Sequence, residues 1–348
     1  MATKKATKGA GFSELRNAIK NGELENIYIF QGEESYLRQR CLEEIKELLI
    51  PAGFEEFNFH RLSGKGLSVQ TLAETVEAMP MMAQHTMVVV SDMDLFKLEE
   101  SQRSALIDLL SDFPDYCTLI FVYDQLPYKR DGKMKKLIGA LDSYVTEVEF
   151  AQQEREQLLR WLKRRFAAVG HDIDAATADH LLFTCGTLMT DLVSEIEKIG
   201  AYAKETNVTV ADINAVCEPI LDARVFDMTN AITAGKFDDA AHVLGELLRM
   251  QVDPIAILAA IGKELRRLYT ARMALDAGKD RFWLKSLWNM SSDYPAKLLL
   301  QAAKRVDHDW CAAAVKRCQI LDRRMKSEKN MDSEQELKLF LMELASGK

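Results

Sequence analysis

The turn after the first apolar run is the first place in this sequence where a phosphate-binding site could form. Residues 27–30 (IYIF) predict a buried strand, and residues 36–49 have helical spacing. A phosphate-binding loop between strand and helix needs several glycines and a lysine. This turn has Gly32 followed by Glu33, Glu34 and Ser35, and two carboxylates would repel a triphosphate. We interpret it as a degenerate phosphate loop that binds no nucleotide, with the acids stabilising the following helix by ~0.3–1 kcal/mol each.

Other patterns of catalytic residues give no active site. Asp92 and Asp94 follow a second apolar run, residues 86–90, as a magnesium-binding acid does in ATPases. Without a phosphate-loop lysine, we interpret them as turn formers. The six histidines form no HExxH motif, and the six cysteines form no CxxC pair and no zinc spacing. The sequence therefore predicts no catalytic residue, no metal and no cofactor.

A methionine-rich corner is the first candidate interaction surface. Pro80 ends the helix predicted over 68–79, which can leave Met81 and Met82 on an exposed corner. Flexible, polarizable methionine side chains suit apolar partner grooves. The alternative is that both pack beneath the helix as core, and the pattern does not decide between these two placements.

A basic turn is the second candidate surface. Lysine and arginine beside a helix N-terminus favour phosphate. The alternative is a solvated helix face, which is the commoner role of such a charge run. The five basic residues that surround this turn are Lys129, Arg130, Lys133, Lys135 and Lys136.

Apolar strands alternate with amphipathic helices up to residue 150, which predicts a mainly parallel sheet with helices on both faces. Beyond residue 152 the pattern is helical to the end of the sequence. We expect an α/β domain followed by two all-α domains, with a boundary at residues 219–222. The predicted domains are 1–150, 151–218 and 219–348, and the predicted strands are 27–30, 54–62, 86–90, 118–123 and 145–150.

Charge and composition limit the partners. The 348 residues carry a net charge of −8, divided into −11 over residues 1–218 and +3 over residues 219–348. No part is basic enough to indicate nucleic-acid binding by charge alone, so contact with DNA is expected only within a larger assembly. The sequence has no run of the ~18–20 apolar residues that a membrane span needs. Its first residues lack the apolar centre of a signal peptide, and we expect a cytoplasmic protein with reduced thiols.

Several segments together resemble one known family, the delta subunit of the bacterial DNA polymerase III clamp loader. Residues 27–37 (IYIFQGEESYL) look like the family's strand followed by G-[DE]-[DE]-x-[FY]-L. Residues 79–82 (MPMM) precede the strand 87–90, as in the family. The order and spacing of these segments over three domains make the resemblance specific. Further matching segments are 129–137, Asp191-Leu192, 195–198, 225–227 and Ala231-Ile232.

The resemblance implies an AAA+-type fold that has lost its ATPase function. The chain would itself be non-catalytic, within the DNA polymerase III holoenzyme, a DNA-directed DNA polymerase and nucleotidyltransferase. It would bind the sliding clamp (the beta subunit) and help to open the ring for loading on primed DNA. ATP would be hydrolysed in sister subunits of a heteropentamer that also contains the delta-prime subunit. Residues 219–348 would form the collar of that assembly.

The resemblance also assigns the clamp contact. The family's apolar contact pair maps onto Met81 and Met82, where many relatives have leucine or phenylalanine. The methionines keep the apolar character without an aromatic anchor. Gln84 and His85 flank the pair and would join the contact.

Three alternatives make different predictions. An active AAA+ ATPase would bind nucleotide at residues 32–38. An ATPase-type sister subunit typically carries a Ser-Arg-Cys motif, which this sequence lacks. A helical adaptor unrelated to replication would not bind the sliding clamp.

Overall fold

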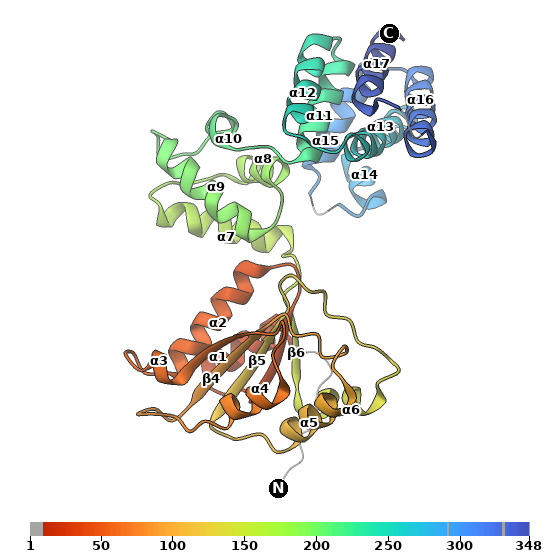
Figure 1. Ribbon diagram of the computed structural model, residues 1–348. Helices are drawn as coiled ribbons and strands as arrows, with labels where there is room; N and C mark the ends of the chain where they lie inside the picture. The colour runs from red at the N-terminus through yellow and green to blue at the C-terminus, as the bar shows by residue number, and fades with distance from the viewer. Residues whose placement is uncertain (1–9, 291, 329–330, 348) are drawn as a thin grey trace. The chain divides into compact units, whose positions relative to one another are not determined.

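The computed structural model describes residues 10–290, 292–328 and 331–347 (Figure 1). The chain forms two compact units, which are described separately. The first ends at Gln153 and also takes in Leu188–Thr190; the second comprises Glu154–Thr187 and the chain from Asp191 onward.

A six-stranded sheet forms the centre of the first unit, and every strand pair in it is parallel. Its strand order is β1-β6-β2-β5-β4-β3. Strands β2, β5 and β4 are continuous apolar runs because helices cover both of their faces. The strand bounds are β1 Ala10–Gly11, β2 Ile27–Gln31, β3 Phe59–Ser63, β4 Thr86–Ser91, β5 Cys117–Val122 and β6 Thr146–Glu149.

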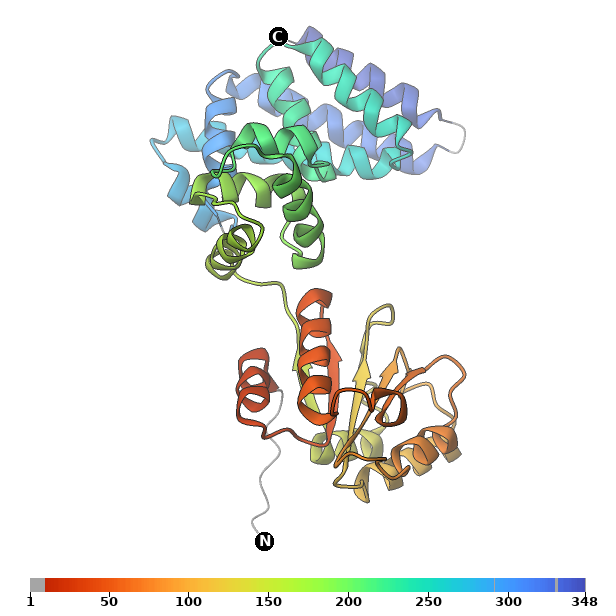
Figure 2. The ribbon, with the colours of Figure 1, turned by 90° about the vertical axis from the view of Figure 1, so that its left-hand side faces the viewer.

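Two helical layers cover this sheet (Figure 2). Helices α1 (Phe12–Asn21) and α2 (Ser35–Leu49) pack on one face, around a core that includes Phe30 and Ile45. The helices of the other layer share a second core that includes Leu72, Leu106 and Leu137. They are α4 (Val69–Val76), α5 (Glu100–Ser111) and α6 (Lys135–Tyr144).

The predicted strand over residues 54–62 is wrong in its first half. Residues Glu55–Asn58 form a short helix, α3, and the strand β3 begins at Phe59. The alternation suggested that Phe57 and Phe59 share a buried face, but Phe57 is 50% exposed. Asn58 is fully buried, and its side chain binds backbone carbonyl groups in place of a strand neighbour.

The second unit is built from helices α7–α17, except for the first two residues of α9, which belong to the first unit. A single apolar core joins α11–α17, and the apolar stripe of α13 contributes Ile257, Ile261, Leu265 and Leu268 to it. None of the helices in the described ranges is long and apolar enough to span a bilayer. The bounds are α7 Arg155–Ala168, α8 Ala175–Cys185, α9 Met189–Tyr202, α10 Val210–Val216, α11 Leu221–Thr233, α12 Phe237–Arg249, α13 Pro254–Asp276, α14 Arg281–Leu287, α15 Tyr294–Ala303, α16 His308–Ser327 and α17 Ser333–Ser346.

The predicted fold class is therefore confirmed: a parallel α/β sheet with flanking helices precedes an all-helical remainder.

Candidate functional site

The methionine corner is exposed. The exposed fractions are 81% for Met79, 53% for Met81 and 77% for Met82. The sequence left open whether the Met81–Met82 pair packs as core, and this exposure excludes that placement. Flexible apolar side chains at this exposure have no packing role within the first unit, so they are available to a partner.

A buried amide fixes the backbone of this corner. The Asn58 side chain accepts the Met81 N–H at 2.8 Å and donates to the Met81 carbonyl oxygen at 2.9 Å. It also donates to the Phe54 carbonyl oxygen at 2.9 Å. Met82 then adopts a φ of +56°, a left-handed conformation that is unusual for a non-glycine residue. These hydrogen bonds give the backbone that carries the two methionines a defined conformation.

Three more residues belong to this surface. Gln84 is exposed and His85 half-buried, and both precede β4 directly. Phe57, half-exposed on α3, directly precedes Asn58, whose side chain binds the Met81 backbone. Sequence reasoning missed Phe57 and Asn58 because it assigned both to a strand. We call Phe57, Met81, Met82, Gln84 and His85 the methionine surface.

The degenerate phosphate loop lies at the opposite edge of the sheet, where the carboxyl end of β2 meets α2. Gly32 has a φ of +112°, and a Cβ atom there would come within 2.5 Å of the Phe150 carbonyl oxygen. The chain passes so closely over residue 150 that only glycine fits. The loop follows the carboxyl end of β2, whereas the methionine surface precedes the amino end of β4, so the two lie at opposite ends of the parallel strands.

Glu34 is the N-cap residue of α2, as its place before the helix predicted, but its side chain makes no capping hydrogen bond there. Fully buried Glu34 accepts the backbone N–H of Met189, in the short segment that belongs to the first unit, at 3.3 Å. Glu33 accepts from the Gln152 amide at 2.7 Å, and Ser35 shares a hydrogen bond with Thr190 at 2.7 Å. The loop is therefore held by hydrogen bonds to other parts of the chain.

Buried Arg38 occupies the neighbourhood in which a phosphate loop would hold its anion. It is 2% exposed, donates to the Gly32 carbonyl oxygen at 2.7 Å and forms an ion pair with Asp124. The carbonyl and the carboxylate engage both terminal nitrogens of this guanidinium, so that among its nitrogens only the buried Nε has no hydrogen-bond partner within the described residues.

Asp92 and Asp94 are turn formers, as predicted. One Asp92 carboxylate oxygen accepts the backbone N–H groups of residues 124, 125 and 126 at 2.9–3.0 Å. Asp94 accepts the Phe96 N–H at 3.3 Å and pairs with Lys97. Asp92, in the position of a magnesium-binding acid, thus organises the loop after β5.

The structure divides the basic turn into two groups. Arg130 donates to Asp142 at 2.6 Å and to Glu147 at 3.0 Å, and Glu147 also accepts the Tyr128 hydroxyl. This network ties Arg130 to β6 and to the end of α6. The other four basic residues are exposed and form no ion pair within the described parts of the chain; they are Lys129, Lys133, Lys135 and Lys136.

The fold and the site together define a class of protein: a parallel α/β sheet, with the turn after β2 held by hydrogen bonds of its own side chains, precedes an all-helical unit. Comparison with known families makes this specific. The model described as "DNA polymerase III, delta subunit" matches residues 28–150, and that of its C-terminal domain matches residues 222–344. Together the matches span more than two thirds of the sequence. The chain belongs to the DNA polymerase III delta subunit family, as the resemblance predicted.

Relatives resemble the chain along most of its length. The DNA polymerase III subunit delta of Bacillus subtilis is 20% identical, over 95% of this chain and 96% of the relative. That of Escherichia coli is 22% identical, over 72% of each chain. The solved B. subtilis DNA clamp loader delta protein has a TM-score of 0.49 at 20% identity and covers 96% of this chain and 99% of its own. The Thermotoga maritima RuvB Holliday junction branch migration motor has a TM-score of 0.40 at 16% identity, over 83% of this chain and 84% of its own.

Proposed function

We propose that this chain binds the sliding clamp, the beta subunit, through the methionine surface and helps to open the ring for loading on primed DNA. The observation that carries the proposal is the exposed Met81–Met82 pair, fixed at its backbone by Asn58. A pre-ordered apolar pair loses little conformational freedom on binding, which favours its use as an anchor.

The energy of such a contact is sufficient for a small hot spot. Burying each methionine side chain fully contributes about 1.5–3 kcal/mol. This energy opens the ring only if the contacts are better with the open clamp than with the closed one. Sister subunits that bind ATP would control when the surface becomes available.

We further propose that the chain does not hydrolyse ATP itself. The support is that Glu34, Arg38 and Asp92 are bound to other parts of the first unit at the edge where a triphosphate and its magnesium would lie. Saturable ATP binding with turnover by the purified chain would contradict this and favour the alternative of an active AAA+ ATPase.

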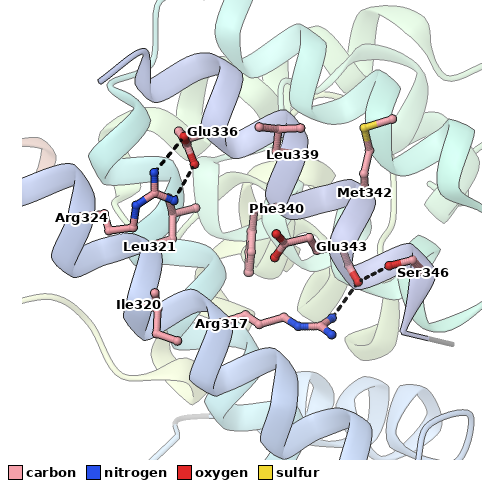
Figure 3. Close-up of a pocket in the computed structure, with 10 residues that line it drawn as sticks. All are labelled: Arg317, Ile320, Leu321, Arg324, Glu336, Leu339, Phe340, Met342, Glu343 and Ser346. Atoms are coloured by element: carbon pink, nitrogen blue, oxygen red, sulfur yellow. Dashed lines mark hydrogen bonds and ion pairs between the residues drawn. The ribbon is translucent and has the colours of Figure 1, made fainter. Parts of the chain in front are cut away.

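The second unit is proposed to contact the ATPase subunits and the delta-prime subunit in a heteropentameric collar. Its last two helices, α16 and α17, line a pocket of about 610 Å³ that is open to solvent (Figure 3). Exposed Ile320, Leu339 and Met342 line it, and the Arg324–Glu336 ion pair at 3.1 Å borders it. An apolar centre beside charged residues is typical of a protein interface.

Primed DNA is the remaining proposed partner, met within the assembly in the cytoplasm. The four exposed lysines of the basic turn support a contact with phosphate, whereas Arg130 is already paired. Neutralising exposed lysines would weaken DNA binding by the assembled loader and reduce its salt dependence.

Calorimetric binding to the sliding clamp of the same organism tests the proposal. We expect Met81→Ser/Met82→Ser to weaken binding at least 100-fold, because two apolar anchors are lost. The matched control is Met250→Ser/Met273→Ser, since these methionines of the second unit are 53% and 51% exposed. Unchanged binding by the first variant would place the contact elsewhere, and no binding by the unmodified chain would overturn the clamp-binding proposal.

A further inference from the structure

Three side chains that are potential metal ligands converge within helices α8–α10. Cys185 ends α8, Glu195 lies in the middle of α9, and Cys217 follows α10 directly. Their two sulfur atoms and one carboxylate oxygen all lie within 4.8 Å of one another. Because the two cysteines are 32 positions apart in the sequence, their spacing did not reveal the cluster.

The surrounding backbone holds this arrangement in place. The Cys217 N–H donates to the Ile213 carbonyl oxygen at 2.9 Å, which ends α10 in a fixed position. The Ile220 N–H donates to the Thr184 carbonyl oxygen at 2.8 Å, which ties the segment after α10 to the last turn of α8. Both cysteines are consequently buried, at 5% and 7% exposure, without a covalent link.

The charges near the cluster suit a divalent cation. Two thiolates and the Glu195 carboxylate carry three negative charges. Lys198 pairs with Glu195 at 2.7 Å and contributes one positive charge, so a divalent ion brings the group to neutrality. Cysteine binds a metal as the thiolate, so metal binding would release protons.

We propose that Cys185, Glu195 and Cys217 bind one zinc ion, with water as the fourth ligand. Thiolate ligands select zinc over magnesium and calcium. A tetrahedral zinc with sulfur at about 2.3 Å separates two sulfur atoms by about 3.8 Å, which is compatible with ligand atoms that all lie within 4.8 Å of one another. The ion would enter past half-exposed Lys198 and cross-link α8, α9 and the segment after α10.

Cobalt titration of the reduced, metal-free full chain tests the site. Co²⁺ replaces zinc and gives an intense thiolate-to-metal absorption band. We expect one saturable equivalent whose band disappears when Zn²⁺ is added. Saturating zinc should also raise the melting temperature of the second unit by about 5–10 °C.

Variants assign the ligands. Cys185→Ser and Cys217→Ser should each weaken Co²⁺ binding at least 100-fold, and Glu195→Gln at least tenfold with the thiolate band retained. The matched control is Cys311→Ser/Cys318→Ser, which removes two buried thiols of α16 that are not part of the cluster. This control should bind Co²⁺ like the unmodified chain.

X-ray absorption of the zinc-loaded unmodified chain identifies the ligands directly. It therefore does not depend on whether the variants fold. The proposal requires two sulfur ligands at about 2.3 Å and two oxygen ligands at about 2.0–2.2 Å. It is overturned if the unmodified chain gives no saturable thiolate band, if the band survives in Cys185→Ser/Cys217→Ser, or if the zinc shell contains no sulfur.

Discussion

At the scale of single residues, two buried contacts position the two edges of the sheet. Asn58 fixes the backbone beneath the methionine surface, and Gly32 allows the chain to pass within reach of Phe150. Neither residue is expected to contact a partner. Substituting either residue therefore changes the backbone conformation at that edge while leaving the side chains proposed to act there unchanged.

Replacing Asn58 should weaken clamp binding although both methionines remain. Asn58→Ala leaves Met81 without its two side-chain hydrogen bonds, so the corner must be ordered on binding. We expect about 10–100-fold weaker binding in calorimetry and about 1–3 kcal/mol lower stability of the first unit. Asn26→Ala is the control, since Asn26 donates only to Pro114 at 3.2 Å. Full clamp affinity in Asn58→Ala would show that pre-ordering is unimportant.

Gly32→Ala should destabilise the first unit by about 2–4 kcal/mol. The added Cβ meets the Phe150 carbonyl oxygen at 2.5 Å, and the φ of +112° is strained for alanine. Gly66→Ala is the control, because Gly66 has a φ of +78° with open space around it and should cost only about 1 kcal/mol. Calorimetric unfolding measures both, and equal losses would disprove the close approach.

At the scale of elements, the hydrophobic pattern of the sequence predicted those strands whose formation depends on their own residues. The runs 27–30, 86–90 and 118–123 correspond to β2, β4 and β5 because strands buried on both faces are continuously apolar. Long-range contacts decided the rest. Residues 55–58 of the strand predicted over 54–62 form α3. There Asn58 binds Met81, a residue 23 positions away, and the same contact fixes the backbone that carries the two methionines.

Helix α13 contains a group that should make the stability of the second unit depend on pH. Glu264 is 7% exposed, and burial raises its pKa to about 7, with nearby Arg267 opposing the shift and Asp222 adding to it. Because the folded pKa exceeds the ordinary value of 4.5, the folded state holds the proton more tightly. The stability that the second unit gains from protonated Glu264 is therefore fully present below about pH 4.5 and is lost as the pH rises through 7.

Glu264→Gln should therefore stabilise the second unit at pH 8 by up to about 3 kcal/mol and change little at pH 4.5. All four tryptophans, at positions 161, 283, 288 and 310, belong to this unit, so urea unfolding followed by tryptophan fluorescence reports on it. Exposed Glu343→Gln is the control and should behave alike at both pH values. An equal effect of Glu264→Gln at both pH values would exclude titration of Glu264 as the cause.

At the scale of the whole molecule, the two proposed interaction surfaces belong to different units. The methionine surface lies in the first unit, and the pocket between α16 and α17 lies in the second. Each unit has its own apolar core. A substitution on one surface should therefore leave the other intact, since changes at sites that share no contacts act independently.

This independence predicts a double dissociation. Leu339→Asp/Met342→Asp puts two charges beside the α16–α17 pocket and should reduce assembly with the sister subunits at least tenfold, because a buried unpaired charge is costly. Its affinity for the clamp should stay within twofold of the unmodified chain. Met81→Ser/Met82→Ser should do the reverse, assembling normally while binding the clamp poorly.

Reconstituted loader, measured by mass photometry, and calorimetry with the clamp give the two readouts. Met250→Asp serves as the control for an added charge at an exposed methionine of the second unit, and it should alter neither. If Leu339→Asp/Met342→Asp assembles normally, the collar contact lies elsewhere on the second unit. If one variant disturbs both readouts while its unit still melts normally, the two surfaces are coupled, and the assignment of one partner to each unit must be abandoned.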